Sequence, residues 1–398
     1  MPNKIYHPFQ HVVPPAPETA LAQCPAAFRP LVERDLDTAW AAIGTATVDN
    51  DVRRTGWNNW AAYARQCGVD PWLREQSKVE KQSYLLAFAA RVRTGIFGLA
   101  VQVGHQSVEI ALRHVAQTLV MAGFDNPRRS HGTNKLDLPF RHLLASYKTQ
   151  EPAPKPQVAL PVSTIEQASA YYQSPSAATR AAADLTTTAF FYLLRVDEYT
   201  MPKSTVRTRT VQFRAQDVTF WRADGTIIPR SAPLAQLLQA ASATLWLDNQ
   251  KNGQRGATIY HKACTSIASC PVKALARRVT SILSFGVAES TPLSFVQPGV
   301  HVQARDITHL VKFAAGATNL GAQGYNLTRV GPHSLRASGA MALKLQVVDD
   351  ATIMKIGWWT GLTFLTYIHA QISALNAGLS QRMATRVHFV NVAGGGAT

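Results

Sequence analysis

A proline-rich stretch constrains the fold of this chain more than any other sequence feature. Residues 150–163, QEPAPKPQVALPVS, contain four prolines, and such a run is extended and semi-rigid, so it spaces two domains. The chain has 398 residues, enough for two domains with separate cores. We therefore predict a helical domain over 31–149, a linker over 150–163 and a second domain with a C-terminal tail over 164–398. Residues 1–30, rich in proline and small residues, are predicted to be a poorly ordered lead-in.

The first predicted domain has a helical pattern. Its apolar residues recur at helical spacing in three runs, and each run stops at or near a glycine. A proline at position 139 suits the first turn of a further helix that continues to about residue 147. The pattern predicts a small helical bundle with its apolar stripes turned inward. The runs are Trp57, Trp60, Ala61, Ala64 and Cys67; Leu85, Phe88, Ala89 and Val92; and Val108, Ala111, Leu112, Val115 and Leu119.

The net charge of +16 favours a polyanionic partner, and nucleic acid is the commonest one. An acidic membrane surface is the rival, but no stretch has the unbroken apolar length of a spanning helix, and the start lacks a signal-peptide core. Basic residues of the first domain are predicted to contact DNA phosphates, the alternative being a solvated basic surface. They are Arg91, Arg93, Arg128, Arg129, Lys135 and Arg141.

The second predicted domain combines helices with hairpins. Helices are expected over 165–172 and from 177 to about 194, and the pattern is helical again from residue 271 onward. Strand signals flank two turns, Ala223-Asp224-Gly225 and Lys251-Asn252-Gly253, and Asn-Gly between apolar runs is a strong hairpin signal. The whole chain is therefore expected to be mainly α with a small β-sheet, the α+β class.

A set of polar residues in the second domain has the composition of an oxyanion site. His333 and Arg336 are three residues apart, so on a helix they share one face. Pro332 suits the start of that helix, and its small apolar residues would let it pack closely. An imidazole beside a guanidinium suits an oxyanion, and Tyr367 could supply an oxygen nucleophile. Taken singly, each residue has an ordinary structural explanation, such as a polar helix face or packing.

Together these residues follow one order along the chain. An arginine with an acid three residues on (Arg195 and Glu198, in LLRVDEYT) precedes a lysine on a hairpin (Lys251, in QKNGQRGATIYH). The sequences GPHSLRASGA and IGWWTGLTFLTYIH follow, with Trp358 nine residues before the tyrosine. This order resembles the tyrosine recombinases, the phage-integrase-like family, and the hairpin is similar to that of integrases carried by eukaryotic mobile elements. The resemblance covers about residues 180–370.

The resemblance implies a fold and a reaction. The fold is an N-terminal helical core-binding (SAM-like) bundle followed by a tyrosine-recombinase catalytic domain. The hydroxyl of Tyr367 would attack a phosphodiester of double-stranded DNA, leaving a 3′-phosphotyrosine and a free 5′-hydroxyl. Arg195 and Arg336 would hold the charge that develops on the phosphate oxygens, so neither metal nor ATP is required. The working form would be a homo-tetramer on two duplexes.

The remaining roles also follow from the resemblance. Trp358 would add an indole N–H donor, and His333 is the expected base. Glu198 would orient Arg195 or His333. Lys251 would protonate the 5′-oxygen leaving group, but it lies 56 residues after Arg195 (251 minus 195), farther than in compact members of the family. Lys203 and Lys262 therefore compete for this role, and the extra length is expected to hold an added strand and helix.

Other interpretations remain open. His261, Cys264 and Cys270 suggest a metal site, but a fourth ligand and a known spacing are missing, so we predict no metal and no cofactor. Four scattered cysteines favour a reducing compartment, either the nucleus or the cytoplasm, and not secretion. The rival functions are a domesticated DNA-binding protein without catalysis and a type IB topoisomerase. The 31 residues after the tyrosine (398 minus 367) either dock onto a neighbouring protomer or fold back.

Overall fold

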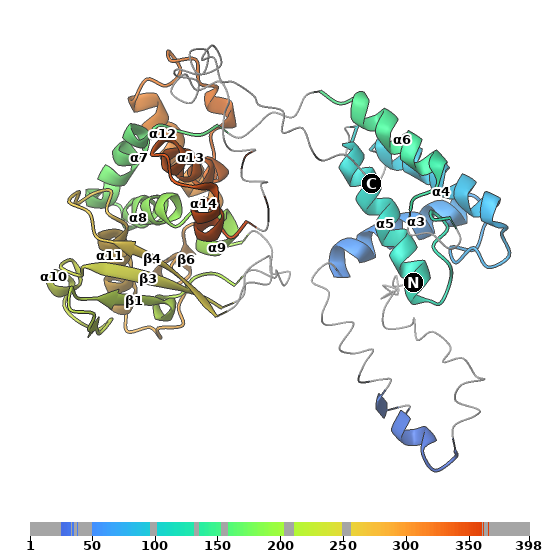
Figure 1. Ribbon diagram of the computed structural model, residues 1–398, viewed down its shortest axis with the longest axis horizontal. Coiled ribbons are helices and arrows are strands. Elements are labelled where there is room, and N and C mark those ends of the chain that lie inside the picture. Colours follow the sequence, from blue (N-terminus) through green and yellow to red (C-terminus); the bar gives the residue numbers. More distant parts are fainter. Residues whose placement is uncertain are drawn as a thin grey trace, which may run out of the picture. The chain divides into compact units, whose positions relative to one another are not determined.

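The computed structural model divides into two compact units, Met1–Pro154 and Lys155–Thr398 (Figure 1). The division falls inside the proline-rich stretch. Residues 1–24, most of the predicted lead-in, lie outside the described part of the chain, whereas residues 25–32 contain a hydrogen-bonded helical turn. The structure describes residues 25–32, 34, 35, 38, 50–95, 102–130, 135–152, 158–202, 211–248, 256–359, 361 and 365.

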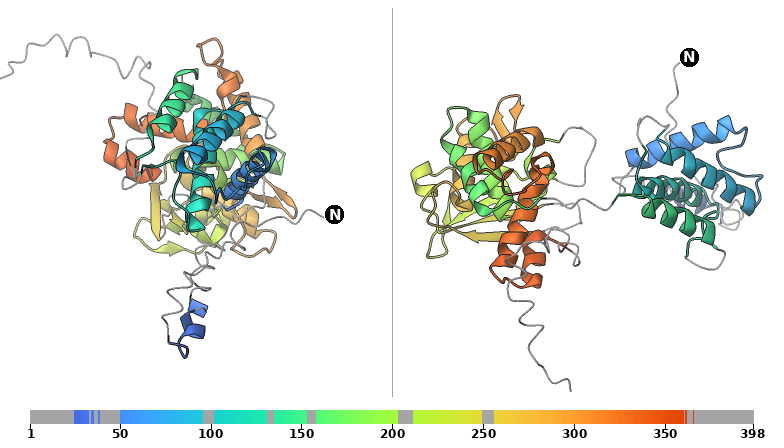
Figure 2. Two further views of the ribbon diagram at one scale, coloured as in Figure 1. Left: turned by 90° about the vertical axis from the view of Figure 1, so that its right-hand side faces the viewer. Right: turned by 90° about the horizontal axis from the view of Figure 1, so that it is seen from above.

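The described part of the first unit is a helical bundle (Figure 2). Each predicted apolar run lies on a helix, except that Cys67 is in the turn after the first one. The glycines at positions 68, 95 and 123, which follow the first three helices, have positive φ. The predicted helices and their stops are therefore confirmed. The helices are α3 (Asn50–Gln66), α4 (Lys78–Arg93), α5 (His105–Met121) and α6 (Leu138–Thr149).

The apolar stripes of these helices form one core. Trp60 is fully buried, and its ring meets that of Phe88 edge-on with the ring centroids 5.3 Å apart. Its indole N–H donates to the carbonyl oxygen of Pro71 (2.9 Å), so the buried polar group is satisfied. Leu112 of α5 and Phe140 of α6 complete the same cluster.

The second unit is built around helix α8 (Ala177–Phe191), whose residues 181–190 are all buried. A helix buried on every side lies at the centre of its domain, and α8 is contacted by helices from both ends of the unit. Figure 1 shows α7, α8, α12 and α13 on one side of the sheet. The other described helices are α7 (Val162–Ser169), η1 (Ala170–Gln173), α9 (Val196–Tyr199), η2 (Ala215–Asp217), α10 (Leu234–Leu237), α11 (Pro271–Leu283), α12 (Ala304–Ala317), η3 (Leu327–Arg329), α13 (Pro332–Leu345) and α14 (Asp350–Gly357).

An antiparallel sheet with the strand order β2-β1-β3-β4 covers one side of this unit. Its strands are β1 (Val218–Trp221), β2 (Ile227–Ile228), β3 (Ser242–Leu247) and β4 (Ala257–Lys262). Both predicted hairpins are confirmed. β2 and α10 are the added strand and helix expected in the extra length between Arg195 and Lys251. The expected mainly α class with a small β-sheet is confirmed as well. The turn with Lys251 lies outside the described residues.

Two sequence predictions for this unit are wrong. The region after residue 271 was expected to be helical, but it includes a second small sheet of β5 (Phe295–Gln297) and β6 (Val300–His301). A Pro-Gly pair joins these strands, and Gly299 has φ +75°, which is the signal that would have located the turn. Helix α8 also ends at Phe191 rather than at residue 194. None of the helices in the described part of the chain is long and apolar enough to cross a membrane.

Candidate active site

The turn after α8 positions the first arginine of the site. Leu193 takes a left-handed conformation (φ +50°), and Arg195 then becomes the N-cap residue of α9. The backbone N–H of Arg195 donates to Glu198 Oε2 (2.7 Å), and its Nη1 donates to Glu198 Oε1 (3.0 Å). Arg195 therefore lies at the start of a short helix and not within α8.

Glu198 is a buried carboxylate between two arginines. Burial raises its pKa, while the bonds to Arg195 and the charge of Arg336 act in the opposite direction. The side chain of Arg195 keeps 19% of its surface exposed. Glu198 thus contacts the guanidinium of Arg195 and holds it, while part of the Arg195 side chain stays exposed.

Close helix packing brings the second arginine to this turn. Gly339 of α13 lies against α8, where a Cβ atom would come within 2.3 Å of the carbonyl oxygen of Phe190. Only a residue without a side chain allows this approach. The predicted close packing of the His333–Arg336 helix is therefore confirmed, and it places Arg336, one turn before Gly339, beside the end of α8.

Arg336 joins two turns of the chain. Its side chain is only 3% exposed; Nη1 donates to the carbonyl oxygen of Leu193, and Nη2 donates to that of Gly357. Its guanidinium carbon lies 4.1 Å from the centre of the Trp359 ring, in the range of a cation–π contact. These contacts hold the guanidinium plane in one orientation and tie the segment with Arg195 to the end of α14.

The end of α14 presents two neighbouring tryptophans. Trp358 is the C-cap residue with φ +54°, half-buried against the main core, whereas Trp359 packs near Ala340 and Ile353. A Cβ atom on Gly357 would come within 1.8 Å of the Trp359 ring. The missing side chain at Gly357 therefore lets this ring cover Arg336. Sequence analysis assigns a role to Trp358 and none to Trp359, although the two tryptophans are adjacent in the chain.

The other predicted site residues differ in what the structure says of them. His333 is exposed in the first turn of α13, on the same face as Arg336 one turn later. Lys262 is exposed at the end of β4, while Lys203, Lys251 and Tyr367 lie outside the described residues. The structure thus brings together Arg195, Glu198, Arg336 and Trp358 through direct and backbone contacts, with His333 on an adjacent turn.

Two tyrosines close to the site are not available as nucleophiles. Tyr192 and Tyr199 are fully buried, and burial raises the pKa of each phenol well above its usual range. The hydroxyl of Tyr192 donates to the carbonyl oxygen of Ala243 (3.1 Å). These rings are part of the core.

The structure corrects two of the predicted DNA contacts in the first unit. Arg93 is buried and bonded to Glu151 (2.8 Å), with its guanidinium 5.0 Å from the Tyr147 ring. Arg128 is also buried, and burial lowers its pKa to about 10. Neither side chain offers a surface contact in this unit. Of the rest, Arg91, Lys135 and Arg141 are exposed and Arg129 is half-buried.

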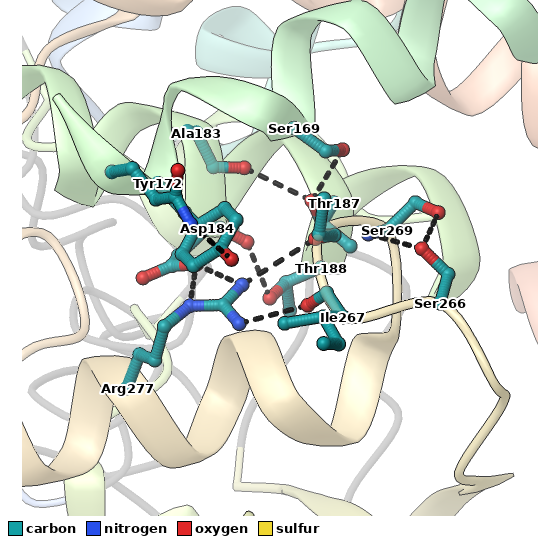
Figure 3. A network of polar contacts seen from close by, with 12 residues as sticks. Ser169, Tyr172, Ala183, Asp184, Thr187, Thr188, Ser266, Ile267, Ser269 and Arg277 are labelled. Atoms are coloured by element: carbon teal, nitrogen blue, oxygen red, sulfur yellow. Dashed lines mark hydrogen bonds and ion pairs between the residues drawn. The ribbon is translucent and has the colours of Figure 1, made fainter.

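A buried ion pair that the sequence did not indicate ties α8 to α11 (Figure 3). Arg277 Nη2 lies 2.6 Å from Asp184 Oδ1, and burial raises the pKa of Asp184 to about 6 although Arg277 opposes the shift. Arg277 also donates to the carbonyl oxygen of Ile267 (3.0 Å) and lies over the ring of Tyr172. The pair therefore fixes the loop before α11 onto the central helix.

The residues weighed as metal ligands have structural roles. His261 packs edge-on against the ring of Tyr192, with centroids 4.6 Å apart, and burial lowers its pKa to about 4. The backbone N–H of Cys264 donates to the sulfur of Cys270 (3.3 Å). Within the described ranges, no three His, Cys, Asp or Glu side chains gather as metal ligands would.

Among the comparisons with known proteins, the comparison with solved structures is the one that finds proteins similar to this chain. No protein-family model and no curated protein matches the sequence. The solved structures that the chain resembles are tyrosine recombinases and integrases. A Tn1549 transposon integrase in complex with transposon right end DNA is 13% identical, with a TM-score of 0.43 over 83% of this chain and 99% of that one. The XerH site-specific recombinase bound to its palindromic difH substrate is 15% identical, with a TM-score of 0.46 over 78% and 74%.

The XerA recombinase is 13% identical, with a TM-score of 0.34 over 85% of this chain and 93% of that one. Likenesses at these identities and scores say nothing about the chemistry of this chain. The functional argument therefore rests on the residues of the site and their contacts.

Proposed function

We propose that the chain is a site-specific DNA recombinase or integrase that cuts and rejoins strands through a 3′-phosphotyrosine. The observation that carries the proposal is the position of Arg336. Its guanidinium bonds the turn that carries Arg195 and the turn that carries Trp358. Residues from three distant segments, which the sequence alone related only by their order, thus meet in one unit.

The two arginines suit the charge that develops on a phosphodiester under attack. Arg195 is held by Glu198 and keeps part of its surface exposed, while Arg336 is fixed by two carbonyl groups and an aromatic ring. Cations that need no rearrangement stabilise the transition state more than the ground state. The buried Glu198 orients Arg195 and stays off the substrate, because an anion beside a phosphate is costly.

Proton transfers complete the proposed reaction. Tyr367 attacks the phosphorus, and its hydroxyl needs a base because an unperturbed tyrosine has a pKa near 10. His333, exposed in the first turn of α13, takes this proton and returns it when the strands rejoin. Trp358 donates an N–H to a phosphate oxygen, and Lys251 protonates the 5′-oxygen that leaves.

Double-stranded DNA is the proposed partner. The chain carries a net charge of +16, and the exposed Arg91, Lys135 and Arg141 of the first unit are proposed as phosphate contacts. We propose that residues 31–149 form the core-binding domain, that residues 164–398 form the catalytic domain, and that four copies act on two duplexes. The place of action would be the nucleus or the cytoplasm, depending on the host element.

A nicked "suicide" duplex tests this proposal. Its broken strand diffuses away after cleavage, so an active protein stays attached to the DNA. The unaltered protein should form this adduct, while Tyr367→Phe should bind the duplex without forming it. Binding without any adduct in the unaltered protein would identify a non-catalytic DNA-binding protein. Relaxation of supercoiled DNA by a monomer, without exchange between two sites, would identify a topoisomerase.

A substrate with a 5′-thio leaving group tests the assignment of the acid. Sulfur leaves without protonation, so only the variant that lacks the true acid should regain cleavage on this substrate. Alanine variants of Lys251, Lys203 and Lys262 should be compared on the oxygen and thio substrates. Rescue of Lys203→Ala or Lys262→Ala alone would refute the assignment of Lys251.

A further inference from the structure

The outward face of the four-stranded sheet carries exposed aromatic side chains. Trp246 pairs across the strands with Thr258, and Tyr260 pairs with Thr244, so both rings lie on one face of β3 and β4. Trp246 is 43% exposed and Tyr260 is 52% exposed. Trp221 of β1 belongs to the same face, and its indole N–H donates to Thr244 Oγ1 (3.3 Å).

The opposite face of the sheet already supplies the core. Phe220, Leu245 and Ile259 point inward and are buried, and α11 contacts three of the strands from that side. The outward aromatics are therefore not needed to close the fold. Large rings on a solvent face, beside the exposed Ile227 that pairs with Trp221, are typical of a binding surface.

The charge on this face suits an anion. The outward positions of the four strands hold one cation and no carboxylate. They are Thr219, Trp221, Ile227, Ser242, Thr244, Trp246, Thr258, Tyr260 and Lys262. The acid that follows β3, Asp248, lies beyond these positions and is 3.0 Å from Arg214, which it shares with Asp217. The chain as a whole is strongly basic. A partner with flat apolar groups and negative charge fits this surface best.

We propose that this face binds single-stranded nucleic acid, with unpaired bases stacked on Trp246 and Tyr260 and a phosphate near Lys262. The two rings occupy diagonal positions on neighbouring strands, and residues in such positions of an antiparallel sheet are roughly 7 Å apart. This spacing lets each ring take its own base. Bases within a duplex already stack on each other, so exposed ring faces select unpaired bases. The proposal goes beyond strand cleavage and does not depend on Tyr367.

A comparison of two oligonucleotides isolates the contribution of the rings. One is an oligothymidylate of roughly 12 nucleotides, and the other is an abasic strand with the same number of phosphates. Binding of both to the full chain is followed by fluorescence anisotropy at moderate salt, where non-specific phosphate contacts are weakened. The unaltered protein should prefer the strand with bases by roughly ten-fold or more.

The Trp246→Ala/Tyr260→Ala double variant should lose this preference and still bind the abasic strand as the unaltered protein does. The matched control is Phe313→Ala, which removes a ring that is 60% exposed on α12 and should keep the preference. Trp246→Phe/Tyr260→Phe keeps two flat rings and should retain most of it. Both double variants change outward positions, and circular dichroism checks their folding.

Two results would overturn the proposal: equal binding of the two strands by the unaltered protein, or an unchanged preference in the alanine double variant. If the preference is unchanged and that variant also differs in self-association, seen by sedimentation, the face joins copies of the chain instead. Tyr367→Phe should keep the preference in either case, so a failure here is distinct from a failure of the proposed cleavage.

Discussion

Replacement of Arg336 should affect both the fold and the reaction, and the two effects can be separated. Its guanidinium donates to the carbonyl oxygens of Leu193 and Gly357 and lies on the ring of Trp359. Arg336→Ala leaves both carbonyl groups in the interior without this donor and removes a positive charge that faces Glu198. We therefore expect lower stability together with the loss of cleavage.

The size of the loss in stability follows from these contacts. A hydrogen bond to a charged group contributes about 1.5–3 kcal/mol, and a cation–π contact adds about 0.5–2 kcal/mol. Removing the buried guanidinium also removes its desolvation cost, so the net loss is about 3–5 kcal/mol, as found for broken buried ion pairs. In a unit of this size such a loss lowers the melting temperature by roughly 6–20 °C.

Arg336→Lys separates the two roles. An ammonium group keeps the charge but has no planar fork, so it can replace only part of the bonding to the two carbonyls. We expect it to lose roughly half as much stability as Arg336→Ala, while cleavage of the suicide duplex falls about 100-fold or more and duplex binding persists. Arg305→Ala, at an exposed position of α12, is the control and should melt as the unaltered protein does. Unaltered melting of Arg336→Ala, or full cleavage by Arg336→Lys, would refute the reasoning.

Three further changes test other parts of the structure. Gly339→Ala places a methyl group 2.3 Å from the carbonyl oxygen of Phe190 and should lower the free energy of unfolding in urea by about 1–3 kcal/mol or more. The control is Gly316→Ala, which has open space around it and should be neutral or stabilising by up to about 1 kcal/mol. Burial lowers the pKa of His261 from 6.5 to about 4, so on acidification the imidazole is protonated at a higher pH in the unfolded chain than in the folded one. The free energy of unfolding should therefore fall by about 3 kcal/mol as the pH drops from 6.5 to 4. An equally steep fall in His261→Gln would contradict this. Trp359→Leu should reduce the cleavage rate at saturating DNA, while Trp359→Phe should retain most of it. An equal loss of rate in both variants would show that the aromatic ring over the guanidinium of Arg336 does not contribute to cleavage.

Local patterns were sufficient to predict most of the secondary structure. The helices of the first unit follow from apolar spacing and from the glycines that end them, and the hairpins follow from Asp-Gly and Asn-Gly between apolar strands. The close approach of α13 to α8 also follows from small residues, above all Gly339. These signals lie within one or two turns of the chain, so a sequence displays them directly.

Contacts between distant residues were not predictable in this way. Arg93 was expected on the surface, but Glu151, 58 residues later, pairs with it in the interior. Trp359 has no local signal for its position over Arg336. The left-handed turn at Leu193 is equally invisible, because leucine rarely adopts positive φ, and that turn shortened α8 and made Arg195 open the next helix. Each of these features depends on packing that a periodic pattern does not encode.

The most direct test of the proposed chemistry is identification of the residue that becomes attached to DNA. The trapped adduct on the suicide duplex should be digested with protease and nuclease and its peptides measured by mass spectrometry. The proposed reaction predicts a nucleotide joined through its 3′-phosphate to Tyr367, with a free 5′-hydroxyl on the released strand. Attachment at any other residue, or a 5′-phosphate link, would contradict it.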